Sequence, residues 1–513
     1  MKKLLAVLVA LLIVACMVPA SATRLDYGLF MNVTPDMYPN TDLSEHKTVE
    51  MLLVGDTPAD WEMVLGAINE ELAEFNTTLH VTFLSWSDHP TMYPLLLTGG
   101  DQLDVCYCAA GWCHLWEEAG NENFYVLTED FIEKYMPLTA QYQDPDSWME
   151  VKLDGKIQAV AQGWCPTGPV LVAIRGDVRE KYGLDKINDY ASYKAYLLGV
   201  AEHTGETGLI ALNCDASEGV RDQYWRGTGL EYMTTATSWR YIYKGGELPT
   251  ADELTYTYKT EAYRAYLDEA KELCEAGVWS RSALNKTETT AQSFGNGTSA
   301  AMQWNYTIYQ YMDLAEKIDG VYCEDYDLAP ESFHTTESYN NSCLAISAAS
   351  KDVERAAMII DVLKWDYTMN MKICYGIEGY HYIDNKDGTY DVNPDHTSGY
   401  VPSCIALSWI VRNGDMSEKF TDPREKAMYD SCESRAAGNV TNGFVFNTEP
   451  VVNEKAAVDA VVSEYRNSLG LGFFDDADAA YAEFMGMMDE AGFEALDTEF
   501  RTQYAAWYDV MVG

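Results

Sequence analysis

Basic residues are scarce in this chain of 513 residues. Lys and Arg number 35 against 80 Asp and Glu, which gives a formal net charge of −45 at pH 7. Such a surface repels phosphate backbones and anionic lipid headgroups, so we expect neither nucleic acid nor a charged membrane as a partner. A neutral ligand would not feel this repulsion. The acidic excess also keeps a protein soluble, and by itself it identifies no specific partner.

Catalytic and metal-binding motifs are also missing. The chain has no H-E-x-x-H, no G-x-S-x-G, no P-loop, and no S-x-x-K accompanied by its partner motifs. Its eight histidines are scattered and do not form pairs at ligand spacing. A carboxylate pair for glycoside cleavage is defined by its separation in space, which a sequence does not show. We therefore expect a protein that is not an enzyme and that holds no cofactor or metal.

Long apolar runs are absent except near the N-terminus. There, after two lysines, residues 4–18 form an unbroken apolar run of 15 residues, and an Ala-Ser-Ala triplet follows at 20–22. The run is shorter than the ~18 to 20 residues of a membrane-spanning helix, and the triplet suits cleavage after Ala22. We therefore predict that residues 1–22 are an export signal, that residues 23–45 are a flexible leader, and that the protein works outside the cytoplasm.

The same segment has a second interpretation. Residues 13–16 read Ile-Val-Ala-Cys, which looks like the lipobox of bacterial lipoproteins, so Cys16 would carry lipid and tether the chain to a membrane. Cleavage after Ala22 fits the small-residue rule better. Lipid attachment at Cys16 is the alternative, and it would be the protein's one link to a membrane.

Cysteines are spread along the chain without a repeated spacing. There are 12 in all, and those beyond Cys16 lie in apolar surroundings, where a free thiol behaves as a small buried hydrophobe. Cys106, Cys108, Cys113 and His114 form a cluster whose spacing is not that of a zinc knuckle, so we expect no metal there. Many unpaired thiols in an exported chain would suit a reducing habitat.

Strands and helices alternate along the chain. Apolar segments at 48–54, 79–86 and 103–108 predict strands, and apolar residues between 61 and 72 recur at helical spacing. Further strands are expected at 170–174, 209–213, 299–304 and 342–346, and further helices at 261–275, 353–365 and 477–488. This alternation predicts an α/β fold with parallel sheets covered by helices on both faces.

Aromatic residues are abundant, with 13 Trp and 36 Tyr, and several follow directly after expected strands. In open α/β sheets, ligands bind beyond the carboxyl ends of the strands. A flat aromatic face beside polar groups suits a sugar ring, whose C–H face is apolar and whose hydroxyls need hydrogen-bond partners. Any single tryptophan could instead pack in the core, but the set indicates a carbohydrate-binding groove. Its candidates are Trp86, Trp112, Trp164, Trp225, Trp304 and Tyr306.

Five segments follow one another in a recognisable order. A strand and turn at 47–56 precede a glycine- and aspartate-rich stretch with a strand and loop at 99–120, and Leu-Asp-Gly-Lys-Ile stands at 153–157. An Ile-Arg-Gly-Asp-Val segment within 172–182 and a Phe-Gly-Asn-Gly segment opening 294–306 come later. Together they resemble the extracellular solute-binding proteins of ABC importers, the family that includes maltose-binding protein. The resemblance covers most of the chain.

Two further segments resemble one subgroup of that family. Tyr-Gly-Ile-Glu-Gly-Tyr-His-Tyr at 375–382 is similar to the G-I-E-G-x-H-Y stretch of lipoprotein-type members that carry a C-terminal domain of unknown function, DUF3502. Gly-Phe-Val-Phe at 443–446 and the closing helices look like that domain. The chain departs from the family after 153–157, where the usual aromatic residue and proline are Gln158 and Ala161.

The resemblance implies a two-lobed periplasmic-binding-protein type II (Venus-flytrap) fold of the α/β class with a helical C-terminal extension. Lobe 1 would comprise residues 46–163 and 340–375. Lobe 2 would comprise residues 164–339 and 376–513, including a DUF3502-like region at about 440–513.

The resemblance also implies a function. The protein would be the extracellular or periplasmic substrate-binding component of an ABC transporter, would capture a carbohydrate, most simply an oligosaccharide, between its lobes, and would act as a monomer that delivers its ligand to a membrane permease. The expected ligand contacts are Asp56, Thr57, Trp86, Asp88, Gly111, Trp112, Trp164, Arg175, Trp225, Trp304, Asn305, Tyr306, Glu378 and His381.

Two other functions fit the same sequence. One is an exported glycoside hydrolase or lyase that uses a carboxylate pair, which would release reducing ends from glycans. The other is a surface lipoprotein adhesin without a soluble ligand, which lipid at Cys16 would favour. The order of the motifs and the missing catalytic signatures favour the binding protein.

Overall fold

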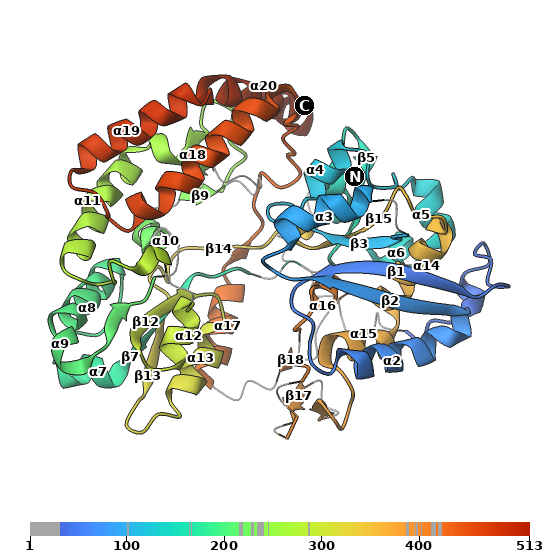
Figure 1. The fold of residues 1–513 in the computed structure, drawn as a ribbon, viewed down its shortest axis with the longest axis horizontal. Coiled ribbons are helices and arrows are strands. Elements are labelled where there is room, and N and C mark those ends of the chain that lie inside the picture. The colour runs from blue at the N-terminus through green and yellow to red at the C-terminus, as the bar shows by residue number, and fades with distance from the viewer. Residues whose placement is uncertain are drawn as a thin grey trace, which may run out of the picture.

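The computed structural model shows two lobes side by side, joined near the middle of the molecule (Figure 1). It describes residues 31–99, 102–163, 165, 167–214, 219–226, 230–232, 241–244, 246–285, 288–385, 389–393, 395–396, 399–401, 403–411, 417–418 and 423–512. The expected signal segment with Cys16 lies outside these residues. The two-lobed α/β architecture with a helical C-terminal extension agrees with expectation.

Lobe 1 is built around a five-stranded sheet in the order β2, β1, β3, β15, β6. These strands are β1 (Lys47–Val54), β2 (Thr77–Leu84), β3 (Val105–Cys108), β6 (Val160–Ala161) and β15 (Cys343–Ile346). β1 is parallel to β2 and β3, whereas β15 is antiparallel to β3 and β6. The sheet is therefore mixed and not parallel throughout as expected, because β15 returns from lobe 2 at the edge where β3 ends.

Helices cover both faces of this sheet, which the fully buried strand β3 requires. They are α2 (Trp61–Leu72), α3 (His89–Thr98), α4 (Leu115–Gly120), α5 (Glu129–Tyr135), α6 (Pro137–Tyr142), α14 (Val353–Trp365), α15 (Tyr367–Tyr375) and α16 (Ala406–Val411). Two short sheets complete the lobe, β4 (Lys152–Leu153) with β5 (Lys156–Ile157), and β16 (Tyr382–Asp384) with β17 (Thr389–Val392) and β18 (Ser417–Glu418). Helix α14 is buried from Arg355 onward and forms the centre of the lobe.

Lobe 2 has a four-stranded sheet in the order β13, β7, β12, β8. The strands are β7 (Leu171–Arg175), β8 (Ile210–Leu212), β12 (Ser299–Trp304) and β13 (Cys323–Tyr326). The helices are α7 (Gly176–Lys181), α8 (Tyr190–Glu202), α9 (Thr204–Thr207), α10 (Arg221–Trp225), α11 (Glu261–Glu275), α12 (Thr290–Gly295), α13 (Ile308–Ala315) and α17 (Pro423–Glu433). A small sheet joins β9 (Leu230–Tyr232), β10 (Tyr241–Lys244) and β11 (Thr255–Tyr256). Strand β7 is antiparallel to both of its neighbours, which again departs from the expected parallel sheet.

The two lobes are joined by crossing segments that lie side by side. The backbone N–H of Gln162 donates to the carbonyl of Ser342 at 2.9 Å, and Thr167 forms an antiparallel bridge with Thr336. A third segment lies beside the second, where β19 (Ala436–Ala437) pairs in parallel with β14 (His334–Thr335). These paired segments lie between the lobes, and we call them the hinge.

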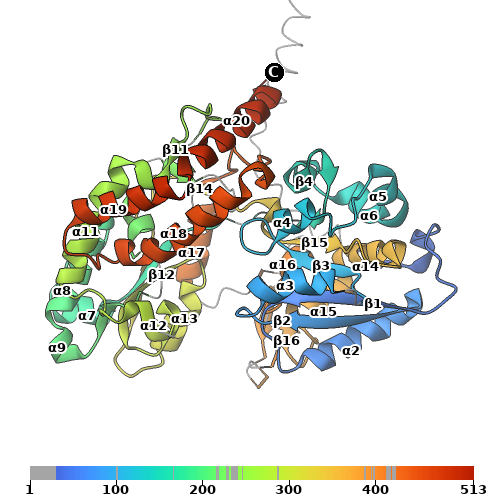
Figure 2. The ribbon, with the colours of Figure 1, turned by 45° about the horizontal axis from the view of Figure 1, so that its top comes forward.

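The C-terminal helices pack on lobe 2, as Figure 2 shows. They are α18 (Val452–Gly470), α19 (Ala477–Glu490) and α20 (Phe493–Val512). Their apolar faces meet around the buried side chains of Phe484, Phe493 and Phe500. The indole N–H of Trp279 donates to the carbonyl of Leu471 at 2.9 Å and ties the helices to lobe 2.

Two expected boundaries differ from the structure. Residues 376–411, expected in lobe 2, belong to lobe 1, because Tyr382, Tyr390 and the buried residues of α16 complete the lobe 1 core. Residues 31–45 of the expected flexible leader pack on lobe 1, since Tyr38 is buried and its hydroxyl donates to Asp361 at 3.1 Å.

Two further properties of the fold are the burial of its cysteines and the hydropathy of its helices. Nine of the eleven cysteines from Cys106 to Cys432 are buried, as their apolar sequence surroundings predicted. In the described part of the chain, no helix combines the length and apolar character that crossing a membrane requires.

Candidate functional site

The edges at which the crossing segments meet the two sheets define a candidate site. In lobe 1, Cys343 pairs with both Cys108 and Ala161, so β3 ends at the edge from which two crossing segments leave. In lobe 2, Trp304 pairs with Leu171, so β12 ends at the edge where the first crossing segment enters. Side chains just beyond β3 and β12 therefore lie on the edges that the two lobes turn toward each other.

An aromatic cluster occupies the lobe 1 edge. The ring centroids of Trp86 and Trp112 are 5.7 Å apart, and Trp409 stacks on Trp86 at 6.2 Å with an interplanar angle of 19°. Trp86 follows β2, Trp112 follows β3, and Trp409 comes from α16, where its indole N–H donates to the carbonyl of Ser403 at 2.9 Å. Trp86 remains 46% exposed despite these contacts. The cluster therefore offers indole surface at the edge of the lobe.

The turn after β1 fits closely around Trp86. Gly55 has φ of 125°, and a Cβ built there would lie 3.3 Å from the Trp86 ring, so this position needs glycine. The next residues, Asp56 and Thr57, are exposed beside the ring. Their side-chain oxygens are exposed to solvent next to an aromatic ring, where a ligand can reach them.

Two other predicted contacts support the same edge. Asp88 is exposed just before α3 and accepts a hydrogen bond from the Ser85 hydroxyl at 2.7 Å. Gly111 has φ of 108° in the turn that precedes Trp112. The structure thus brings together six lobe 1 residues that the sequence predicted, namely Asp56, Thr57, Trp86, Asp88, Gly111 and Trp112.

The lobe 2 edge carries Trp304, Asn305 and Tyr306. Trp304 is 61% exposed, and Asn305 accepts hydrogen bonds from the backbone and hydroxyl of Thr307 to begin α13. The Tyr306 hydroxyl lies 3.1 Å from that of Thr167 in the first crossing segment. The exposed indole of Trp304 is thus the main lobe 2 group open to a ligand, while Tyr306 also braces the hinge.

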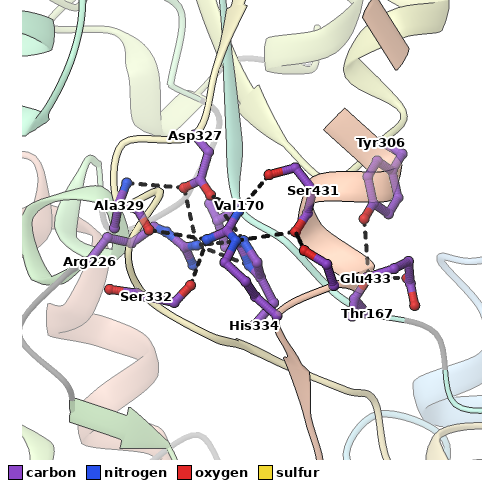
Figure 3. Close-up of polar contacts among 12 residues, drawn as sticks. Thr167, Val170, Arg226, Tyr306, Asp327, Ala329, Ser332, His334, Ser431 and Glu433 are labelled. Atoms are coloured by element: carbon purple, nitrogen blue, oxygen red, sulfur yellow. Dashed lines mark hydrogen bonds and ion pairs between the residues drawn. The ribbon is translucent and has the colours of Figure 1, made fainter. Parts of the chain in front are cut away.

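A polar cluster at the hinge, which we call the hinge cluster, consists of Arg226, Asp327 and His334, which Figure 3 labels, together with Arg435. Asp327 lies 2.9 Å from Arg435, 3.3 Å from Arg226 and 3.0 Å from His334 Nε2. Arg226 also lies 3.0 Å from His334 Nδ1 and 3.3 Å from His334 Nε2. Its members come from α10, the end of β13, β14 and the approach to β19, so the cluster fixes the crossing segments to lobe 2.

The hinge cluster does not suit a metal ion. Asp327, His334 and Cys432 place potential ligand atoms within 4.8 Å of one another. Burial alone would raise the pKa of Asp327, but the His334 hydrogen bond and the Arg226 guanidinium hold that pKa well below its usual range. A cation there would compete with two guanidinium groups for the same carboxylate. The cluster was not predicted from the sequence, since its members are separated by up to about two hundred positions.

Several predicted contacts lie elsewhere. Because β7 is antiparallel to β12, Arg175 lies at the far edge of the lobe 2 sheet, where it forms a two-pronged ion pair with Asp177 at 2.7 Å. Trp225 is only 6% exposed and packs against Tyr263 in the core shared with the C-terminal helices. Trp164 falls outside the residues that the structure describes.

The predicted pair Glu378 and His381 forms a tight turn in lobe 1. His381 is 1% exposed; its Nδ1 accepts from the backbone N–H of Ile377 at 2.9 Å, and its Nε2 lies 3.4 Å from Asp60 at the start of α2. Gly376 has φ of 84°, and a Cβ there would lie 2.6 Å from the His381 ring. His381 therefore anchors the turn, and Glu378 is exposed on its surface.

Comparisons with known proteins identify the C-terminal region first. Residues 440–509 match the family model described as domain of unknown function (DUF3502). A curated protein from Streptococcus pneumoniae serotype 4, named carbohydrate ABC transporter substrate-binding protein, is 20% identical over 504 residues, which cover 94% of this chain and 96% of that protein.

Solved structures share the fold. The N-glycan transport solute binding protein NgtS from Streptococcus pneumoniae, in complex with Man1GlcNAc, matches with a TM-score of 0.67 and 16% identity over 89% of this chain and 98% of its own. NgtS is also known in complex with Man5GlcNAc, where the TM-score is 0.66. Maltose-bound MalE3 from T. maritima matches with a TM-score of 0.51 and 16% identity over 87% of this chain and 99% of its own.

These findings agree with the order of motifs, the two lobes and the position of the C-terminal helices. The curated relative spans nearly the whole chain, and the DUF3502 match coincides with α18 to α20 and the segment that leads into them. The chain therefore carries a DUF3502 domain at its C-terminus and shares the two-lobed fold of solved solute-binding proteins.

Proposed function

We propose that the protein captures a neutral oligosaccharide between its lobes and delivers it to the permease of an ABC importer. The aromatic cluster of lobe 1 carries this proposal, because Trp86 keeps indole surface exposed at the edge that faces lobe 2. Trp304, exposed on the facing edge, supplies a second flat surface. Indole faces stack on the apolar C–H faces of sugar rings, which are the least well hydrated part of a sugar.

Polar groups around the cluster suit sugar hydroxyls. Asp56, Thr57 and Asp88 are exposed on the lobe 1 edge, and Asn305 is exposed on the lobe 2 edge. Carboxylates accept hydrogen bonds from hydroxyls, while hydroxyl and amide groups both donate and accept. With a formal net charge of −45, the protein disfavours anionic sugars and leaves neutral ones unaffected.

Closure of the lobes about the hinge supplies the mechanism. A ligand held by one lobe gains the contacts of the other only when the lobes approach, so it shifts the equilibrium toward the closed form by its preference for that form. The hinge cluster holds the crossing segments to lobe 2, so that the motion is confined to their passage into lobe 1. A permease can then distinguish the closed, loaded carrier from the open, empty one. No bond in the ligand is broken.

The relatives suggest which sugars to test first. The curated relative is named for carbohydrate, and NgtS is named for N-glycan transport and was solved with Man1GlcNAc and Man5GlcNAc. We therefore propose that mannose-containing N-glycan fragments belong to the ligand class of this protein.

We further propose that the chain acts outside the cytoplasm as a monomer. An export signal at residues 1–22 accounts for its location, with lipid attachment at Cys16 as the alternative to cleavage after Ala22. Mass spectrometry of the N-terminus of the exported protein distinguishes the two.

Calorimetric titration with Man1GlcNAc, Man5GlcNAc and maltose tests the proposed function. We expect saturable binding of at least one N-glycan fragment, a higher melting temperature in its presence, and no release of reducing ends on prolonged incubation. Release of reducing ends would indicate a hydrolase. The absence of both heat and thermal shift across the panel would contradict the proposal and favour a structural role at the cell surface.

A further inference from the structure

A groove with a volume of about 550 Å³ separates lobe 1 from the start of the DUF3502 domain. One wall is formed by α4 and the β4–β5 hairpin of lobe 1, and the other by residues 446–449 and Val452 at the start of α18. None of the three tryptophans of the aromatic cluster lines it. The groove is therefore distinct from the site proposed above, and its volume falls within the ~300 to 1,000 Å³ of small-molecule sites.

The DUF3502 wall is held firmly by its own domain. Phe446 packs on Phe500 with ring centroids 5.2 Å apart. The side chain of Gln503 in α20 exchanges two hydrogen bonds with the backbone of Asn447, each of 2.8 Å. This wall therefore moves with the C-terminal helices and lobe 2, whereas the facing wall belongs to lobe 1.

Apolar side chains are exposed on both walls. Val126 on the lobe 1 wall is 37% exposed, and Val452 on the DUF3502 wall is 57% exposed. The half-buried ring of Trp116, in the first turn of α4, also lines the groove. Apolar surface that lines a groove and remains in contact with water is typical of a binding site.

The polar side chains that line the groove indicate which kind of ligand it can bind. Acidic side chains, among them Glu117, Glu122 and Glu449, outnumber the one lysine, Lys156, and the amide of Asn121 lies beside them. This charge balance disfavours an anionic occupant. Carboxylate and amide groups next to apolar rings match a neutral ligand that is rich in hydroxyls.

The groove begins close to the aromatic cluster. Trp116, which lines the groove, follows Trp112 of the cluster by four residues, across the turn and bridge that precede α4. A ligand that extends past Trp112 along α4 would therefore enter the groove.

We propose that this groove is a second carbohydrate-binding subsite, which takes a neutral arm of a long or branched oligosaccharide whose other end lies at the aromatic cluster. The inference rests on the proposed function and assigns a role to the start of the DUF3502 domain. Because the two walls belong to different lobes, an arm bound there contacts both, and it strengthens the preference of the ligand for one arrangement of the lobes. Long ligands would gain affinity from the subsite, and short ones would not.

Glycine positions allow a test that removes no packing. Gly120 lies in α4 on the groove wall, and a Cβ built there meets nothing within 4 Å. Gly66, exposed in α2, offers the same open space away from the groove. Gly120→Phe would fill the groove, Gly120→Ala would not, and Gly66→Phe is the matched control.

We expect Gly120→Phe to weaken the binding of Man5GlcNAc about tenfold and to leave that of Man1GlcNAc unchanged, as measured by calorimetric titration of the full chain. Gly120→Ala and Gly66→Phe should bind both sugars as the unaltered protein does. Equal binding of Man5GlcNAc by Gly120→Phe and Gly66→Phe overturns the subsite but leaves the proposed function intact. Failure of the unaltered protein to bind either sugar overturns both.

The opposite wall provides a second variant in case Gly120→Phe does not fold. Val452→Trp fills the groove from the DUF3502 side, and Val510→Trp in α20, where the valine is 79% exposed, is its control. Hydrogen exchange adds a direct measurement, because Man5GlcNAc should slow exchange in residues 446–452 and Man1GlcNAc should not. Equal protection of this segment by both sugars would contradict the subsite.

Discussion

Trp86 is the residue on which ligand recognition depends most directly in the proposed site. Its ring stacks on Trp409, lies against Gly55, and still presents 46% of its surface. Gly55 was predicted only as part of a turn, and the need for glycine there follows from the approach of this ring.

We expect Trp86→Ala to lower the affinity for a bound glycan by about 1 to 3 kcal/mol, since it removes a central aromatic contact. The melting temperature should change little because the side chain is half exposed. Calorimetric titration measures the loss, and Trp507→Ala in the DUF3502 domain is the control for losing a tryptophan elsewhere. Unchanged affinity in Trp86→Ala would exclude the lobe 1 edge as the binding surface.

A second residue, Glu150, links pH to stability. It is buried beside the second crossing segment, where its carbonyl accepts from the side chain of Asn340 at 2.7 Å. Burial raises the pKa of Glu150 to about 7, against the opposing effect of backbone N–H groups of Tyr339 and Asn340. The folded state thus binds this proton more tightly than the unfolded chain. The stabilising contribution of Glu150 to the free energy of unfolding is therefore fully present below about pH 4.5 and is lost as the pH rises through 7.

Glu150→Gln should therefore be more stable than the unaltered protein at pH 8, by as much as about 3 kcal/mol, and the difference should shrink toward pH 4.5. Urea unfolding at several pH values measures it. Glu464→Gln, at an exposed position of α18, is the control for loss of a surface carboxylate. A constant difference between pH 4.5 and 8 would argue against a buried, protonated carboxyl.

At the scale of elements, the crossing segments depend on the hinge cluster. Asp327, with its side chain 5% exposed, is shared by Arg226, Arg435 and His334, which approach it from three separate elements. Removing the shared carboxylate would leave two guanidinium groups without their common counter-charge.

Asp327→Asn should therefore reduce the free energy of unfolding by about 3 kcal/mol, as expected when one partner of a buried ion pair is lost. Asp430→Asn breaks an exposed pair with Lys426 and should cost less than about 0.5 kcal/mol. Urea unfolding at neutral pH compares them, and equal effects of the two substitutions would show that the hinge cluster is not a stabilising element.

Helices and strands could be predicted from the sequence where the spacing of apolar residues along the chain is regular. The strand expected at 48–54 is β1 at Lys47–Val54, and the helix expected at 353–365 is α14 with the same bounds. Strand direction was not predictable. Arg175 was expected at the site because its segment resembles that of a known family, but β7 is antiparallel to β12 and carries Arg175 to the far edge.

At the scale of the whole molecule, ligand binding should change shape. The exposed aromatic surfaces of Trp86 and Trp304 lie on different lobes, so a sugar that contacts both must draw them together. We expect the radius of gyration from small-angle X-ray scattering to fall when a binding glycan is added, and to remain unchanged in Trp86→Ala at the same glycan concentration. A radius that stays constant in the saturated, unaltered protein would contradict closure.

The sequence by itself determined the class of fold, and it led to the expectation of strand-end tryptophans at Trp86, Trp112 and Trp304 and of a neutral ligand, because periodicity, composition and charge are properties of neighbouring residues or of the whole chain. Only the tertiary structure decided that residues 376–411 complete lobe 1, that Asp327 and Arg435 meet at the hinge, and that a groove separates α4 from the DUF3502 domain. These features arise between segments separated by tens to hundreds of positions, and which segments meet depends on how all of them pack together.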